Sequence, residues 1–160
     1  MKDEVKENCL SPDELFMRMA IRQARMAAEQ GETPVGAVIA HQGHLIGQAF
    51  NQVELLKDPT AHAEILAITQ AASALGDWRL NDTVMYVTKE PCPMCAGAII
   101  LARIPRVVWG MTDPLRGGAI SLFNIFSAKP LNHKPEYTAG VMEKECRELV
   151  QSFFKKLRAT

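Results

Sequence analysis

The sequence predicts a single three-layer α/β/α domain, with a central mixed sheet of about five strands and helices on both faces. Three observations support this fold class. Short apolar segments of strand length alternate with longer segments of helical periodicity, which is typical of a sheet covered by helices. A tight turn joins the first two predicted strands, so part of the sheet is antiparallel. The 160 residues suit one domain, and no repeat or linker divides residues 1–160.

The first predicted helix begins at Ser11 and ends at Gly31. Ser11 is a favourable N-cap, Pro12 suits the first helical position, and Glu14 lies three residues after the serine, as in a capping box. Gly31 is a typical residue just beyond a helix end. The helical periodicity is carried by Phe16, Met19, Ala20, Gln23 and Ala27. We expect the charged residues 1–10 to form a flexible N-terminus.

Two strands are predicted after this helix. Residues 35–40 and 45–50 are both rich in apolar residues, and the polar residues 41–44 between them indicate a hairpin. His41 and His44 could form a metal site of their own. Polar turn residues are the simpler interpretation of this pair.

A loop and a second helix follow the hairpin. Residues 51–59 are predicted to be the loop, and they lead into a helix that carries His62 and closes at Gly76. The apolar face of this helix consists of Ile65, Ile68, Ala72 and Leu75.

The second half of the chain continues the alternation. Residues 84–88 are predicted to be a buried strand, residues 96–102 lie in a helix, and residues 106–110 form another short strand. Residues 113–134 form a long irregular segment, and such segments in a small domain are usually functional or mobile. The C-terminal helix has an apolar face, in which Cys146 is a core residue, formed by Met142, Cys146, Leu149, Val150, Phe153, Phe154 and Leu157.

Two motifs contain residues that typically bind metal. They are Thr60-Ala-His-Ala-Glu64 and Glu90-Pro-Cys-Pro-Met-Cys95. Catalytic zinc is held by three protein ligands and keeps a fourth position open for water or substrate. One histidine and two thiolates are such a set, so His62, Cys92 and Cys95 are the candidate ligands of one zinc ion.

The spacing of these ligands favours one common site. Cys92 and Cys95 are three residues apart and share one face of a helix. Pro91 and Pro93 suit the start of that helix, where the amide dipoles favour thiolate over thiol. His62 follows a loop with capping residues, so it also lies at a helix start. The sequence therefore predicts two helix N-termini that point at one metal ion.

Glu64 is the candidate catalytic residue. A carboxylate beside a metal can accept and return a proton if it does not coordinate the ion itself. Each motif alone has a simpler interpretation, since a single histidine is usually satisfied by ordinary hydrogen bonds and a Cys-x-x-Cys pair can be a redox pair. The combination of H-x-E with P-C-x-x-C is much more specific and is the signature of zinc deaminases.

Composition narrows the possible environments. No apolar run approaches the ~18 residues that a membrane helix needs, and the N-terminus has no signal-peptide core. Four cysteines, two of them assigned to metal, provide no disulfide framework. We therefore expect a cytoplasmic protein without a membrane partner. A formal net charge of zero argues against a large non-specific RNA surface but allows a small, shape-selective one.

With these motifs, the chain resembles the bacterial tRNA-specific adenosine deaminases, which have the cytidine-deaminase-like fold. The resemblance extends from about Phe16 to Leu157. Asn132-His133 and the Phe153-Phe154-Lys-Lys tail favour tRNA deaminases over other members of the superfamily. The matching segments are Thr33–Val38, Asn51, Asp58–Glu64, Tyr86–Ala98, Arg103–Gly110, Asp113, Leu131–His133 and Cys146–Arg158.

This resemblance implies a reaction and a set of partners. A hydroxide on the zinc attacks C6 of an adenine, Glu64 shuttles the proton, ammonia leaves and inosine remains. The implied substrate is the wobble adenosine in the anticodon arm of an arginine tRNA, and the implied assembly is a homodimer; no DNA partner is expected. By matching positions, Asn51 holds the flipped base, and Asp113, Asn132 and His133 contact the nucleotide or its neighbours.

Two features differ from the family pattern. Pro93 stands where many members carry a valine or a similar residue. The resulting motif, Pro-Cys-Pro-Met-Cys, resembles the corresponding motif of bacterial guanine deaminases, which act on a free base. Residues 114–121 differ from the commoner Gly-Ala-Ala-Gly-Ser pattern near the expected RNA contacts. The alternatives are a free-base or nucleoside deaminase, acting on guanine or cytidine, and a non-catalytic zinc-stabilised RNA-binding subunit. The presence of Glu64 argues against the second alternative.

Overall fold

The structure is a computed structural model, and it describes residues 9–160. Most of the predicted flexible N-terminus, residues 1–8, lies outside the described residues. Helices and strands alternate as the sequence predicts. In chain order they are α1 (Pro12–Glu29), β1 (Gly36–His41), β2 (His44–Phe50), α2 (Val53–Leu56), α3 (Ala63–Leu75), β3 (Thr83–Lys89), α4 (Pro93–Leu101), β4 (Arg106–Met111), the 3-10 turn η1 (Ile125–Ser127), β5 (Glu136–Ala139) and α5 (Glu143–Ala159).

The strands form one mixed sheet in the order β2-β1-β3-β4-β5. β1 is antiparallel to β2 and to β3, whereas β3, β4 and β5 run parallel. The carboxyl ends of β3 and β4 therefore meet at the same edge of the sheet. β3 leads there into α4 and β4 leads into the long segment that begins at Thr112, so both deliver residues to one place.

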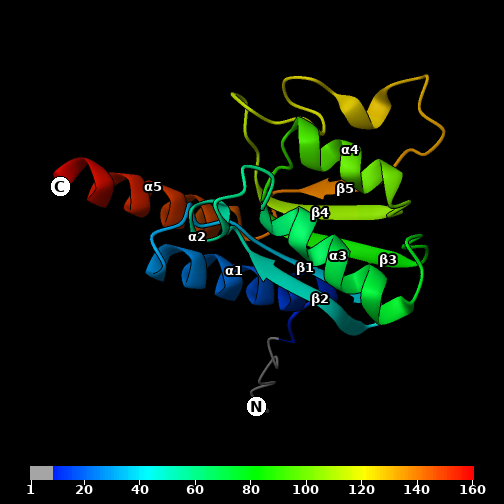
Figure 1. Ribbon diagram of the computed structural model, residues 1–160, viewed down its shortest axis with the longest axis horizontal. Coiled ribbons are helices and arrows are strands. Elements are labelled where there is room, and N and C mark those ends of the chain that lie inside the picture. Colours follow the sequence, from blue (N-terminus) through cyan, green and yellow to red (C-terminus); the bar gives the residue numbers. More distant parts are fainter. Residues whose placement is uncertain (1–8) are drawn as a thin grey trace, which may run out of the picture.

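Helices cover both faces of this sheet (Figure 1). α3 and α4 pack on one face, and α1 and α5 on the other. Alternation along β1 shows how the sequence produces two cores: Ala37 and Ile39 join the α3/α4 core, whereas Val38 and Ala40 join the α1/α5 core. The predicted three-layer α/β/α fold with a five-stranded mixed sheet is confirmed.

Local signals explain where the helices begin and end. Both halves of the predicted capping box are present at α1, since Ser11 accepts a hydrogen bond from the Glu14 N–H and Glu14 accepts one from the Ser11 N–H. Gly76 ends α3 at φ 68°, a left-handed conformation that favours glycine. Cys146 is 1% exposed and packs in the α1/α5 core, as predicted.

Two elements lack a clear sequence signal. The edge strand β5 follows the segment that is predicted to be irregular, and three of its four residues are exposed, so it has no apolar alternation. The one-turn helix α2 lies inside the predicted loop 51–59 and has no buried residue. Within residues 9–160, no helix combines the length and the apolar character needed to span a bilayer.

Candidate metal centre and its cavity

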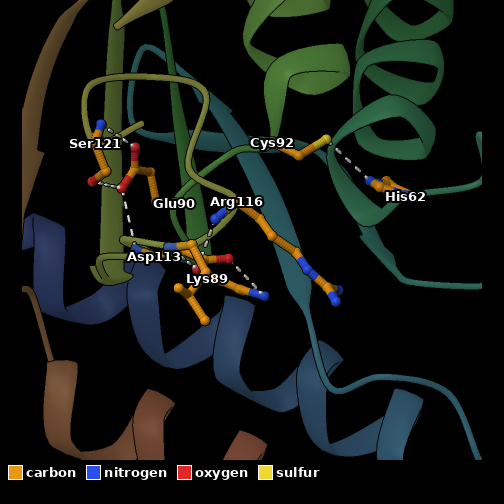
Figure 2. A network of polar contacts seen from close by, with 8 residues as sticks. His62, Lys89, Glu90, Cys92, Asp113, Arg116 and Ser121 are labelled. Carbon is orange, nitrogen blue, oxygen red and sulfur yellow. Dashed lines mark hydrogen bonds and ion pairs between the residues drawn. The ribbon is translucent and has the colours of Figure 1, made fainter. Parts of the chain in front are cut away.

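His62, Cys92 and Cys95 form a compact cluster at the start of two helices. His62 is the N-cap of α3, Cys92 is the N-cap of α4, and Cys95 lies in the first turn of α4. The Nδ1 atom of His62 is 3.5 Å from the Sγ atom of each cysteine, and all three ligand atoms lie within 4.8 Å of one another. Cys92 and His62 point toward each other in Figure 2.

The donor set and its spacing fit a zinc ion. Imidazole and thiolate are ligands that zinc prefers. Two atoms that bind the same tetrahedral zinc at about 2.0–2.3 Å lie about 3.4–3.8 Å apart. The two distances of 3.5 Å between His62 and the cysteines agree with that spacing. These residues can therefore hold a metal ion without rearrangement of the backbone.

The electrostatics of the cluster favour one thiolate. The pKa of Cys92 is lowered to about 4, first by the hydrogen bond with Cys95 and then, against the effect of burial, by His62. The pKa of Cys95 is raised by the same bond to Cys92 and by burial. The pKa of His62 is raised, mainly by its hydrogen bond with Cys92. Metal binding requires that both thiols lose their protons, so the affinity for the ion will decrease as the pH is lowered.

Glu64 lies beside this cluster in the first turn of α3. Glu64 is only 4% exposed. The pKa of its carboxyl is raised, and burial is the largest cause. Hydrogen bonding with Cys95 acts in the opposite direction. The clustered ligand atoms belong to His62, Cys92 and Cys95 and not to Glu64. The carboxylate is therefore placed next to the candidate ion and remains available for proton transfer.

A cavity of about 500 Å³ opens above His62, Glu64 and Cys92. This volume suits a small ligand such as a nucleoside. The cavity is lined by residues from the end of α1, the ends of β2 and β3, α2, the starts of α3 and α4, the segment after β4, and the C-terminal part of α5. Its lining includes Thr33, Val35, Asn51, Val53, Glu54, Lys89, Asp113, Arg116, Phe153, Phe154 and Leu157.

Two buried glutamates hold the walls of this cavity. Glu32, which is 1% exposed, accepts hydrogen bonds from the N–H groups of Glu54 at 3.2 Å and Leu55 at 2.6 Å. It therefore fixes α2 on one side. Glu90, which is 3% exposed, accepts hydrogen bonds from the segment after β4 on the other side. In each case a glutamate carboxylate accepts hydrogen bonds from backbone N–H groups that have no partner in a helix or strand.

Asp113 carries charge at the cavity wall. It forms an ion pair with Lys89, whose Nζ atom is 3.0 Å from Oδ2, and its Oδ1 atom accepts hydrogen bonds from the N–H groups of Leu115 and Arg116. Burial is the largest single influence and raises the pKa of Asp113, but Lys89 and the two N–H groups together hold that pKa below its usual value. Figure 2 shows Lys89 and Asp113 side by side.

The structure brings together most, but not all, of the predicted site residues. Asn51 and Asp113 line the same cavity as His62, Glu64 and Cys92, while Cys95 lies behind them in the cluster. Asn132 and His133 do not line this cavity.

Asn132 and His133 lie instead near the carboxyl end of α4. The Nε2 atom of His133 is 2.7 Å from the carbonyl oxygen of Ile104, which precedes β4. The two residues therefore lie outside this cavity in the single chain, and their contact with the nucleotide or its neighbours stays a prediction. The physical reason is that the long segment after β4 crosses from the site to the opposite end of α4 before β5 begins (Figure 1).

Sequence reasoning missed other residues of the site. Glu32, Lys89, Glu90 and Arg116 all contact or line the cavity. The backbone partners of Glu32 and Glu90 are more than 20 positions away, as in the bond from Ile120 to Glu90, which spans 30 positions. The one available signal was a charged residue at the end of an apolar strand, as Lys89 and Glu90 are.

A buried glutamate beside a His, Cys, Cys cluster on a three-layer α/β/α fold defines the zinc deaminase class. Comparisons with known proteins agree with this class. The family model for MafB19-like deaminases matches residues 11–158. The tRNA-specific adenosine deaminase of Bacillus subtilis is 45% identical over 93% of this chain and 92% of its own length. That of Aquifex aeolicus is 47% identical over 91% of this chain and 95% of its own length. This chain thus belongs to the tRNA-specific adenosine deaminase family.

Solved structures extend the comparison. A structure from a study of A-to-I editing by tRNA:A34 deaminases superimposes with a TM-score of 0.82 at 43% identity, and covers 84% of this chain and 98% of that chain. A guanine deaminase from Nitrosomonas europaea has a TM-score of 0.78 at 22% identity, and covers 91% of this chain and 86% of that chain. The second likeness shows only that the fold is shared.

Proposed function

We propose that this chain is a zinc-dependent hydrolase that deaminates adenosine to inosine at the wobble position of tRNA, with an arginine tRNA as substrate. The observation that carries the proposal is Glu64, a buried carboxylate beside a three-residue metal cluster at the floor of a nucleoside-sized cavity. Kinship with tRNA-specific adenosine deaminases at 45–47% identity supports the choice of substrate.

In this proposal His62, Cys92 and Cys95 hold the zinc ion. A bound zinc ion supplies a Lewis acid and lowers the pKa of a water molecule in the open position. Glu64 would take one proton from the attacking water molecule and deliver it to N1 of the adenine as the C6–O bond forms. Glu64 then moves the second proton to the amino group, which leaves as ammonia when the C6–N bond breaks. Water and adenosine thus give inosine and ammonia.

Asn51 and Asp113 are proposed to orient the base and its neighbours. Asn51 is 8% exposed and lines the cavity, so its amide is positioned to hydrogen-bond the edge of a base. Asp113 and Arg116 lie at the wall, and Phe153 and Phe154 line the cavity from α5. An anticodon loop presents unpaired bases to such a cavity at little cost, because they are already accessible.

Contacts from Asn132 and His133 stay a prediction. In the proposal they reach nucleotides that flank the target base and not the target base itself. Asn132→Ala is expected to slow the reaction on RNA and to leave zinc content unchanged. A normal kcat/KM for this variant would remove Asn132 from the set of substrate contacts.

Homodimerisation and a cytoplasmic location are also proposed. The α4 side of the molecule exposes large apolar side chains that a partner copy can cover, since Leu101 is 71% and Phe123 is 58% exposed. Proteins that act on tRNA in bacteria work in the cytoplasm. No DNA or membrane partner is proposed.

The experiment that tests the substrate compares kcat/KM for three molecules with the purified zinc protein. These are an arginine tRNA anticodon stem-loop with adenosine at the wobble position, free guanine and free cytidine. The stem-loop is expected to be preferred by several orders of magnitude. Protein loops can bind the nucleotides that flank the target base, and a free base offers no such contacts. A stem-loop with adenosine moved one position in the loop is the matched control. Faster turnover of guanine or cytidine would replace the proposal with a small-molecule deaminase.

A further inference from the structure

Glu90 joins the metal-binding start of α4 to the segment after β4. Its N–H group donates to the carbonyl oxygen of Met111 at 2.8 Å, and its carboxylate is buried. The Oε1 atom accepts hydrogen bonds from the Asp113 N–H at 3.2 Å and from the Ser121 hydroxyl. The Oε2 atom accepts from the N–H groups of Ile120 and Ser121, both at 3.0 Å. Figure 2 shows this carboxylate between Ser121 and Asp113.

These contacts define which kind of side chain is needed at position 90. Every group that meets the carboxylate is a donor: three backbone N–H groups and one hydroxyl. A side chain that only accepts, as a carboxylate does, satisfies all of them, whereas an amide brings two donors of its own. Glu90 thus closes both ends of the loop 113–121 with one side chain.

Two glycines allow the loop to pack this closely. A Cβ atom at Gly117 would lie 2.5 Å from the carboxylate of Glu90. A Cβ atom at Gly118 would lie 2.3 Å from the backbone nitrogen of Pro93, next to the ligand Cys92. Gly118 N–H also donates to the carbonyl oxygen of Pro91 at 2.8 Å. The loop therefore rests directly on the segment that carries the metal ligand.

The same loop carries charge into the cavity. Asp113 begins it and forms the ion pair with Lys89, and Arg116 lines the cavity three residues later. The N–H of Asp113 is held by Glu90, and the N–H of Arg116 is held by the Asp113 carboxylate. Glu90 thus holds Asp113, and Asp113 in turn holds Arg116.

We infer that Glu90 is a positioning residue for substrate binding: through the loop 113–121 it sets the places of Asp113 and Arg116 at the cavity wall. This inference rests on the proposed deamination of an RNA adenosine. Glu90 touches no reacting atom in it and acts only through Asp113.

Glutamine is the informative substitution at position 90 because it keeps the shape of the side chain. Its amide nitrogen is expected on the Oε1 side, where the Ser121 hydroxyl can turn and accept a hydrogen bond. Two backbone N–H groups face the other oxygen and cannot turn. Glu90→Gln therefore loses one contact, the N–H of Asp113, and keeps the contacts with the N–H groups of Ile120 and Ser121.

The test measures kcat, KM and bound zinc for Glu90→Gln, Asp113→Ala and the double variant on the wobble-adenosine stem-loop. Glu90→Gln is expected to lower kcat/KM about 10- to 100-fold, mainly through KM, with full zinc. If Glu90 acts through Asp113, the double variant is no worse than Asp113→Ala alone. Glu145→Gln, on the exposed face of α5, is the matched control and is expected to behave like the unmodified chain.

A purely structural role gives a different pattern. In that case kcat and zinc content fall together, KM is unchanged, and the effects of Glu90→Gln and Asp113→Ala multiply. That pattern, or a kcat/KM for Glu90→Gln equal to that of the unmodified chain, overturns the inference.

Hydrogen exchange of the same variants separates this inference from the proposed function. The amides of Asp113, Leu115 and Arg116 are expected to exchange faster in Glu90→Gln, whereas those of Ile120 and Ser121, which keep their acceptor, are expected to be unchanged. If the unmodified chain forms no inosine in the stem-loop, the proposed function fails. The exchange result still decides whether Glu90 holds the loop. Unchanged exchange of the Asp113, Leu115 and Arg116 amides refutes that Glu90 positions this part of the loop.

Discussion

Glu64→Gln tests the proton-transfer role proposed for Glu64. The side chain keeps its size in a site that is 4% exposed, so no cavity forms. The amide cannot accept and return a proton at neutral pH. Loss of a general acid/base lowers the rate about 10²–10⁴-fold, which corresponds to about 3–5 kcal/mol in the activation barrier. Because Glu64 carries two proton transfers in the proposed mechanism, the upper end of this range is expected.

Stability and metal content separate this loss from misfolding. Glu64 is not among the clustered ligand residues, so Glu64→Gln should bind the same amount of zinc. Replacing a buried carboxyl with a neutral amide removes a desolvation cost, so the midpoint of thermal unfolding should not fall. The assay is single-turnover inosine formation on the stem-loop, with Glu145→Gln as control. Turnover within a few-fold of the unmodified chain, or loss of zinc, would refute the assigned role.

Three further predictions concern stability and assembly. Gly36→Ala should destabilise the fold by at least about 1–3 kcal/mol in urea unfolding, because its Cβ would lie 2.1 Å from the carbonyl oxygen of Ala20. Gly97→Ala is the control and should not destabilise the fold, because its Cβ meets nothing within 4 Å in the chain. Asp13 has a lowered pKa, chiefly through its hydrogen bond with Arg106, so the stability lost in Asp13→Asn should be full above about pH 5 and should shrink as pH falls below about 4; a difference that grows in acid would contradict this. Light scattering at micromolar concentration should give the mass of a dimer, and a monomer would contradict the proposed assembly.

The sequence was informative where the signal is local. The cluster of the candidate ligands His62, Cys92 and Cys95 could be predicted because helix starts place neighbouring residues by short-range geometry, and the two helix starts do meet. The alternation of apolar segments was sufficient for the layers, because β1 and β3 are buried on both faces.

Long-range features were not predictable in the same way. β5 is a mostly exposed edge strand with no alternating pattern, so its four residues resemble a loop in sequence. The roles of Glu32 and Glu90 depend on backbone N–H groups 22 to 31 positions away, which no local pattern encodes. The place of Asn132 outside the cavity was not predictable for the same reason, because it depends on the path of the whole segment after β4.

The most direct test of the proposed account is a zinc titration of metal-free protein with inosine formation as the readout. Activity on the wobble-adenosine stem-loop should rise linearly with added zinc and stop rising at one ion per chain, because His62, Cys92 and Cys95 form one site. The double variant Cys92→Ala with Cys95→Ala should bind no zinc at this site and remain inactive at every zinc concentration. Full activity in metal-free protein, or activity in the double variant, would contradict the proposed metal centre.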